Sequence, residues 1–145
     1  MEQRTDGQAW AWIVLAVLAG TAWIGANEFL RNEILFKSLW VDHFASLGLV
    51  FPSAMINNAL WGLWSLLFAS VVLVVTRRFS VAESIPLAWV FGFLMMWVVV
   101  GNLGGLPLRI LPIAVPWSLV EVSGAVLIVR AVAAHHAPRI RQTKA

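Results

Sequence analysis

The sequence contains no cysteine and no tyrosine, and it has only three histidines. Without cysteine the chain can form no disulfide, no thiolate metal site and no cysteine nucleophile. Two of the histidines, His135 and His136, are adjacent, so on a helix their rings would point about 100° apart and would suit one metal ion poorly. No HExxH, GxSxG or P-loop motif is present. The sequence therefore indicates no catalytic residues, no metal and no cofactor, and it favours a protein that is not an enzyme.

Charged residues are also scarce, at 12% of the 145-residue chain, whereas hydrophobic residues make up 61%. Soluble domains are usually about 45–50% apolar, and a helix needs about 20 mostly apolar residues to cross a bilayer. Four runs meet that length, at approximately 9–28, 51–75, 85–103 and 112–134. The sequence therefore predicts an all-α integral membrane protein, in which residues 1–145 form one domain built as a four-transmembrane-helix bundle.

The segment between the first two runs is too polar to cross a membrane. Its apolar residues recur at helical spacing and are Leu35, Phe36, Leu39, Trp40, Phe44 and Leu47. Glu33, Lys37 and Asp42 lie off that face, and Glu33 and Lys37 are four residues apart, which favours an ion pair on a helix. We expect a short amphipathic interfacial helix at approximately 33–47, lying on the membrane surface. The alternative is a solvated loop.

Basic residues are distributed unequally between the two sides of such a bundle. Arg4, Arg77, Arg78, Arg130, Arg139, Arg141 and Lys144 lie on the side of the termini, and Arg31, Lys37 and Arg109 lie on the other. The positive-inside rule then predicts a bacterial plasma (inner) membrane protein with both termini, including a basic tail at 135–145, in the cytoplasm. The pI of about 10.7 fits this topology and contact with anionic lipid. The expected partners are the lipid bilayer and a second copy or another membrane protein, and not nucleic acid.

One acid, Glu121, lies well inside the fourth run. Such a residue costs about 2.5–3.5 kcal/mol on insertion scales and usually faces the bundle interior. Ser118, Gly124 and Ala125 share its helical face, and Trp117 lies one turn before it. Small residues allow helices to approach closely in lipid. The carboxyl either hydrogen-bonds to a neighbouring helix as structural support or belongs to a ligand or proton site.

The other polar residues within the runs gather toward the outer side. The candidate ligand or proton site comprises Glu121, Asn57, Asn58, Asn102, Trp117 and Trp61, and its mouth comprises Asn27, Glu28, Arg31 and Arg109. The inner half is expected to form an apolar plug from Leu15, Leu18, Leu66, Leu67, Val71, Leu73, Leu127 and Ile128. Tryptophan walls with a few polar groups are typical of a binding pocket.

Three functions remain open from the sequence. The first is an outward-facing polar and aromatic pocket around Glu121 that binds an apolar or amphipathic ligand, such as a lipid. The second is a structural or accessory subunit of a membrane complex. The third is a proton-coupled small transporter that acts as an oligomer. A path for a polar solute needs polar lining along its whole length, so the apolar inner half favours the first.

Overall fold

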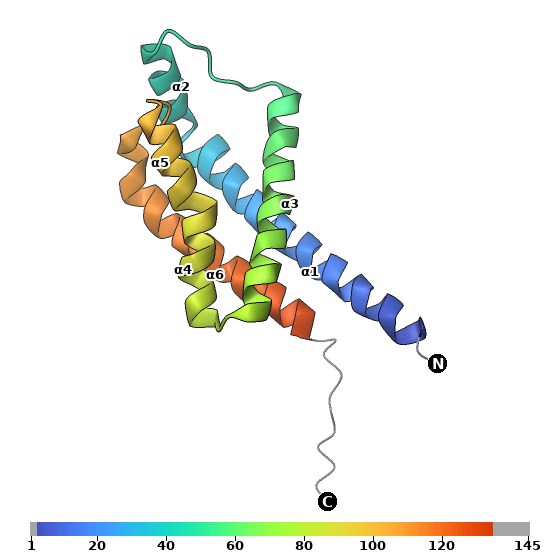
Figure 1. The fold of residues 1–145 in the computed structure, drawn as a ribbon. Helices are drawn as coiled ribbons and strands as arrows, with labels where there is room; N and C mark the ends of the chain where they lie inside the picture. Colours follow the sequence, from blue (N-terminus) through green and yellow to red (C-terminus); the bar gives the residue numbers. More distant parts are fainter. Residues whose placement is uncertain (1–2, 135–145) are drawn as a thin grey trace, which may run out of the picture.

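The structure is a computed structural model that describes residues 3–134, and every regular element in that range is helical (Figure 1). The elements are α1 (Gln3–Phe29), the π-helical η1 (Leu30–Leu35), α2 (Lys37–Ser46), α3 (Met55–Arg78), α4 (Val81–Trp89), the π-helical η2 (Val90–Leu94), α5 (Met95–Asn102), the 3-10 helical η3 (Leu108–Ile110) and α6 (Leu111–Ala134). The basic tail predicted at 135–145 lies outside the described residues.

Four continuous helical stretches are long and apolar enough to cross a membrane. They are Trp10–Leu35, Met55–Arg78, Val81–Asn102 and Leu108–Ala134. The prediction of an all-helical protein with four membrane-length helices is confirmed. The first stretch continues beyond residue 28, where the sequence suggested its end, because Glu28 and Arg31 form an ion pair and so remain compatible with a buried helix.

Local signals in the sequence explain where these helices begin and end. Ser80 caps α4: its hydroxyl accepts the Glu83 backbone N–H, and the Glu83 carboxylate accepts the Ser80 N–H at 2.9 Å. This reciprocal capping box satisfies two backbone donors at the helix start. Gly48 and Gly104, each with φ of +73°, follow the ends of α2 and α5. Glycine adopts this left-handed conformation without a steric penalty and commonly terminates helices.

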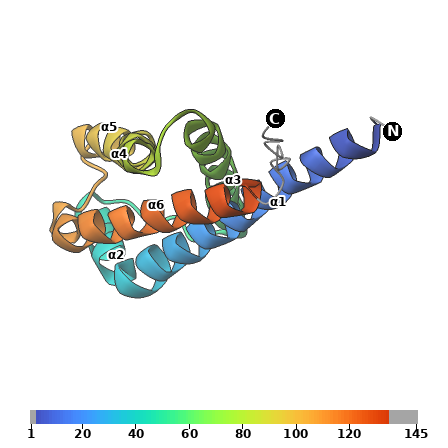
Figure 2. The same ribbon diagram turned by 90° about the horizontal axis from the view of Figure 1, so that it is seen from below.

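The helix α6 packs against α1, α3 and α4, and α3 also packs against α1 and α4. Seen from below, α1 and α6 lie beside each other, α3 lies across both of them, and the α4–α5 stretch lies beside α6 (Figure 2). The start of α1, the end of α6 and the α3–α4 turn lie at one end, which we call the terminal end (Figure 1). The helix α2 and the α5–α6 connection lie at the opposite end, which we call the α2 end.

Toward the terminal end the helices pack closely through small and branched side chains. Ala16, Ala69, Val72, Val126 and Val129 are all fully buried there. A Cβ added at the buried position 20 would lie 2.7 Å from Val129 Cγ2 and 3.2 Å from Ala69 Cβ, so glycine is needed for this approach of α1, α3 and α6. This half of the bundle is closed by tight packing.

The predicted membership of the apolar plug is wrong. Of its eight residues only Leu73 is buried, and six are exposed: Leu15, Leu18, Leu66, Leu67, Val71 and Leu127. Large aliphatic side chains can face lipid at little cost, whereas the interior of closely packed helices admits small ones. The core of the terminal half is apolar as expected, but its large aliphatic residues point outward.

Two π-helical turns change which residues face the interior. A π turn adds one residue to a helix and so rotates everything after it by about 100°. Ala88 and Gly92 face inward as the helical period predicts, but after η2 the inward positions are Met96 and Val100 instead of Met95 and Val99. In η1 the N–H of Phe36 donates to the carbonyl of Arg31, five residues earlier, at 2.9 Å.

The helix α2 occupies Lys37–Ser46, within the range of 33–47 where the sequence predicted an interfacial helix. The first part of that range belongs to η1 instead, because the helix of the first span continues through Leu35. Phe36 is buried against Leu106 and Ile110, whereas Leu35 is exposed. The position of α2 on a membrane surface stays a prediction.

Candidate functional site

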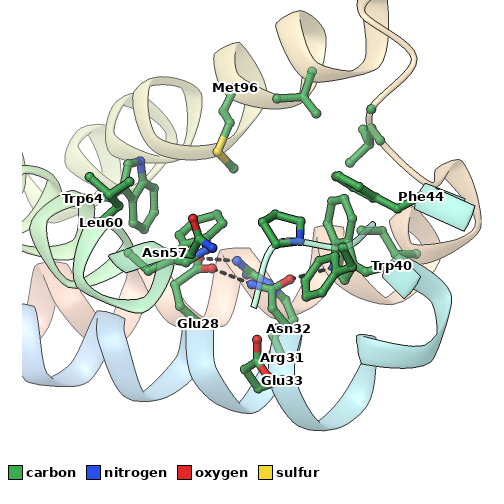
Figure 3. A pocket seen from close by; sticks show the side chains of 18 of the residues that line it. Glu28, Arg31, Asn32, Glu33, Trp40, Phe44, Asn57, Leu60, Trp64 and Met96 are labelled. Carbon is green, nitrogen blue, oxygen red and sulfur yellow. Dashed lines mark hydrogen bonds and ion pairs between the residues drawn. The ribbon is translucent and has the colours of Figure 1, made fainter. Parts of the chain in front are cut away.

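A cavity of about 450 Å³ lies at the α2 end, between η1, α3, α5 and the start of α6 (Figure 3). Six aromatic side chains line it: Trp40, Phe44, Phe51, Trp61, Trp64 and Trp97. Its polar lining consists of Glu28, Arg31, Asn32, Glu33, Asn57 and Asn58. The volume lies within the usual range of about 300–1,000 Å³ for small-molecule sites, and the mixture of aromatic surface with few polar groups is typical of them.

The cavity exists because α3 and the α4–α5 stretch separate toward the α2 end. They are joined by the short turn at the terminal end, and the upper part of α3 diverges from α5 (Figure 1). Leu60 and Trp61 of α3 and Met96 and Val100 of α5 line opposite sides of the resulting space. The connection between α2 and α3 crosses above it and contributes Phe51 and Pro52 to the lining.

A buried ion network borders the cavity. The Arg31 Nη1 atom donates to Glu121 Oε2 at 2.9 Å, and its Nη2 atom donates to Glu28 Oε1. The exposed fractions of Glu28, Arg31 and Glu121 are 4%, 3% and 0%. The Arg31 guanidinium also lies 4.9 Å from the centre of the Phe93 ring, a distance suited to a cation–π interaction. One arginine thus joins the carboxylates of two different membrane helices, α1 and α6.

The network continues toward α2 through hydrogen bonds. Asn32 Nδ2 donates to Glu28 Oε2 at 2.7 Å, and Trp40 Nε1 donates to Asn32 Oδ1 at 3.1 Å. Figure 3 shows Glu28, Arg31 and Asn32 together at the base of the cavity, with Asn57 facing them from α3. The network therefore fixes the orientation of α2 relative to α1 as well as that of α6.

The charges in this network do not balance. In their ordinary ionised forms, Glu28 and Glu121 carry two negative charges against one positive charge on Arg31. The Glu121 Oε1 atom is buried and has no hydrogen-bond partner among residues 3–134. Burying a charge is expensive unless it is paired and hydrogen-bonded. A single arginine balances one of the two carboxylates, so this site is neutral either with one carboxyl protonated or with a further positive charge close by.

Tight packing of α1 on α6 positions Glu121. A Cβ at Gly124 would lie 2.5 Å from the ring of Trp23, so the absence of a side chain at Gly124 makes room for the indole. Trp23 Nε1 donates to the backbone carbonyl of Glu121 at 2.8 Å. One turn before Glu121 on α6, Ser118 Oγ accepts a hydrogen bond from Trp89 Nε1 at 2.8 Å. The small residues predicted around Glu121 therefore lie where other helices approach α6.

The structure brings together some of the residues that the sequence grouped. Asn57, Asn58 and Trp61 line the cavity, and so do Glu28 and Arg31, which the sequence assigned to its mouth. Glu121 is not part of the lining, but it contacts the lining residue Arg31 directly. Arg31 is buried between two carboxylates instead of lying exposed at a mouth.

Besides Glu121, four residues of the predicted site lie outside the cavity lining. They are Asn27, Asn102, Trp117 and Arg109. Asn27 Nδ2 donates to the Trp23 carbonyl one turn earlier. Asn102 is exposed because the π turn η2 rotates the end of the helix away from the interior. Arg109 is exposed on η3, and the Trp117 Nε1 atom is buried without a hydrogen-bond partner in the described part of the chain.

The sequence analysis missed the central role of Arg31 and the contributions of Asn32, Trp40, Trp64 and Phe93. One signal was present for Arg31, which follows Glu28 by three residues and can therefore pair with it on a helix. A deep acid such as Glu121 also requires a partner. The contact between Arg31 and Glu121 spans 90 positions of sequence and carries no local pattern.

Within residues 3–134 no group of three or more histidine, cysteine, aspartate or glutamate side chains is arranged to hold a metal ion. No family model, no curated protein and no solved structure matches the chain. The cavity and its ion network are therefore the features from which a function can be argued.

Proposed function

We propose that this protein binds one apolar or amphipathic molecule of drug-like or single-chain size in the cavity at the α2 end. The observation that carries the proposal is a volume of about 450 Å³ lined by six aromatic side chains and bordered by a buried ion network. Aromatic rings bury much apolar area with defined geometry, and a few polar groups at one end orient a ligand.

The exposure of the wall residues favours entry from the bilayer. Leu60 and Trp61, on the α3 wall of the cavity, are 56% and 44% exposed. They lie in a helix apolar enough to cross a membrane, so their exposed surface faces lipid. Toward the aqueous end, Phe44 of α2 and Phe51 of the following connection line the cavity and partly cover it. A ligand that partitions into the membrane could therefore enter sideways between α3 and α5.

The distribution of charge favours a cavity on the non-cytoplasmic side. Arg4, Arg77, Arg78 and Arg130 belong to helix ends at the terminal end and three more basic residues follow in the sequence, whereas the α2 end has three, Arg31, Lys37 and Arg109. By the positive-inside rule the terminal end would be cytoplasmic. The ligand would then come from the outer leaflet of a bacterial plasma membrane.

Binding is favoured over transport by a single chain because, among the described residues, the terminal half has no cavity with polar lining. Its interior is filled by aliphatic side chains, and the hydroxyls of Ser65 and Thr76 donate to carbonyls of their own helix. A role as an accessory subunit would use the same ion network for assembly. Filling the cavity would block ligand binding, whereas it would leave a role in assembly through the ion network intact.

The test is to fill the cavity and measure binding. Met96 lines the cavity, whereas its neighbour Met95 does not and is 54% exposed. We would record native mass spectra of the protein in a mild detergent with a twelve-carbon monoacylglycerol as the probe. A saturable one-to-one adduct is expected for the wild type and for Met95→Trp, with at least tenfold weaker binding for Met96→Trp. Equal binding to both variants, or no saturable adduct with the wild type, would refute the proposal.

A further inference from the structure

We propose that the ligand carries a positive charge, and that it is an amphiphile with an ammonium group at its polar end. This inference rests on the proposed binding function and adds the chemical class of the ligand. It follows from the charge of the ion network, from the hydrogen-bonding groups left free in the cavity and from its aromatic walls.

The network has two acids for one base. Glu28 and Glu121 share the single guanidinium of Arg31, so the network is neutral only with one carboxyl protonated or with a second cation beside it. Both acids are almost completely buried, so water screens a charge at this place poorly. A cation bound in the adjacent cavity would allow both carboxyls to be ionised, with the proton released to solvent, whereas an anionic group would find no free positive charge to pair with in the described lining.

Among the described residues, the lining leaves no free positive charge for a ligand. Arg31 is the only basic residue in the lining, and it already donates to both carboxylates. Lys37, the nearest alternative in sequence, pairs with Glu33 at 2.5 Å. No basic side chain among the described lining residues is therefore free to receive an anionic group.

Acceptors, in contrast, are available. The side chains of Asn57 and Asn58 line the cavity and make no hydrogen bond within residues 3–134, so their carbonyl oxygens are free. Glu28 accepts two hydrogen bonds from Arg31 and Asn32, and its two oxygens have lone pairs for more. Figure 3 shows Asn57 and Glu28 facing each other across the base of the cavity. An ammonium group placed there would be surrounded by acceptors.

The aromatic walls of the cavity also favour a cation. Cations are attracted to the faces of tryptophan and phenylalanine rings, most strongly where water is excluded. Arg31 already makes such a contact with Phe93, which packs against Trp64 and Trp97 with ring centres 5.9 and 5.6 Å apart. Trp64 and Trp97 both line the cavity, so the same surface that holds an alkyl tail would also favour a cationic head.

The experiment compares probes that share a twelve-carbon tail and differ only at the polar end. Dodecyltrimethylammonium, monolauroylglycerol and dodecyl sulfate would be bound to the wild type and measured by native mass spectrometry, with Met96→Trp as the blocked reference. We expect dodecyltrimethylammonium to bind at least tenfold more tightly than the neutral probe, and dodecyl sulfate to bind most weakly. Tetramethylammonium, which lacks the tail, should compete only at about hundredfold higher concentration.

Two acid-to-amide variants test the origin of this preference. Glu121→Gln removes the second carboxyl and leaves Arg31 and Glu28 to balance each other, so the ratio of cationic to neutral affinity should fall at least fivefold. Asp42→Asn removes an acid of α2 that does not line the cavity, so it should leave the ratio unchanged.

The outcomes separate the two proposals. Equal affinities for the three probes, or a preference for dodecyl sulfate, would overturn the inference while leaving the proposed binding function in place. Efficient competition by tetramethylammonium would show that the alkyl tail is not needed, so it would refute an amphiphilic ligand and indicate a small soluble cation. If the ratio of cationic to neutral affinity is unchanged in Glu121→Gln, the ion network is not the cause of the preference for a cation. Adducts that are insensitive to Met96→Trp for every probe would refute the binding function as well.

Discussion

The two halves of this bundle are built from the same helices but hold together by different means. In the terminal half, Gly20, Ala69 and Val129 bring three helices into close contact without any ion pair among the described residues. In the half at the α2 end, the helices separate around a cavity, and Arg31 links them through charges. Close packing needs only side chains of suitable size, whereas a hollow region needs directional bonds to fix the helices around it.

The largest expected effect is the removal of Arg31. Arg31→Met would leave two buried carboxylates without their shared partner, and breaking a buried pair in this way costs about 3–5 kcal/mol. Unfolding in detergent, followed by circular dichroism, should show this loss of stability. The exposed Arg109→Met is the control and should unfold like the wild type. A stable Arg31→Met would mean that packing alone holds the half at the α2 end.

Two substitutions of Glu121 distinguish how much its hydrogen bond and its charge each contribute to the stability of the network. Glu121→Gln keeps an oxygen that can accept from Arg31, so its stability should stay within about 1 kcal/mol of the wild type. Glu121→Leu leaves an Arg31 donor unsatisfied and should cost about 1–3 kcal/mol. The same unfolding assay applies. Equal stability of the two variants would show that Arg31 needs only Glu28.

Gly20→Ala tests the close packing of the terminal half. The added Cβ would lie 2.7 Å from Val129 Cγ2, and overpacking of this kind typically costs about 1–3 kcal/mol. The control is Gly62→Ala on α3, where an added Cβ meets nothing within 4 Å. That substitution should be neutral or stabilising by up to about 1 kcal/mol, because alanine has the higher helix propensity. A destabilising effect of the same size at both positions would contradict the contrast between the halves.

The smallest effect on stability is expected at the cavity wall. Asn57→Ala removes a side chain that makes no hydrogen bond in the described part of the chain, so the free energy of unfolding should change by less than about 0.5 kcal/mol. Ser118→Ala is a useful contrast, because it leaves the Trp89 N–H without its acceptor and should cost about 1–3 kcal/mol. A large loss of stability in Asn57→Ala would indicate a structural instead of a binding role for this residue.

The sequence predicted those features that depend on local composition. Hydrophobic runs gave four membrane-length helices, and the small residues around Glu121 indicated helix contacts that Gly124 and Ser118 do make. The pairing of Glu33 with Lys37 followed from their spacing. Each of these properties is determined within a few turns of one helix, so a single sequence contains the information.

The features that the sequence did not reveal depend on contacts between distant segments. No pattern marks the extra residue in η2, yet this residue turns Met96 inward and Asn102 outward. The contact of Arg31 with Glu121 follows from the packing of α1 on α6 and not from either segment alone. Trp117, expected at the pocket, lies one turn from Glu121 along the helix but outside the cavity lining. Residues that share a helix face do not necessarily reach the same cavity.

The short turn between α3 and α4 has a mechanical consequence. It is fixed by the capping box of Ser80 and by a hydrogen bond from Arg130 Nη1 to the Phe79 carbonyl at 3.1 Å. The other end of α3 is attached only to the irregular connection that follows α2. Between this turn and Ala69, α3 is held by its close contacts with α1 and α6, so only the part before Ala69 can bend, with Trp61 about 12 Å along it at 1.5 Å per residue. A rotation of about 5° near Ala69 would move Trp61 by about 1 Å, so the firmly held half of α3 limits how far the cavity can widen.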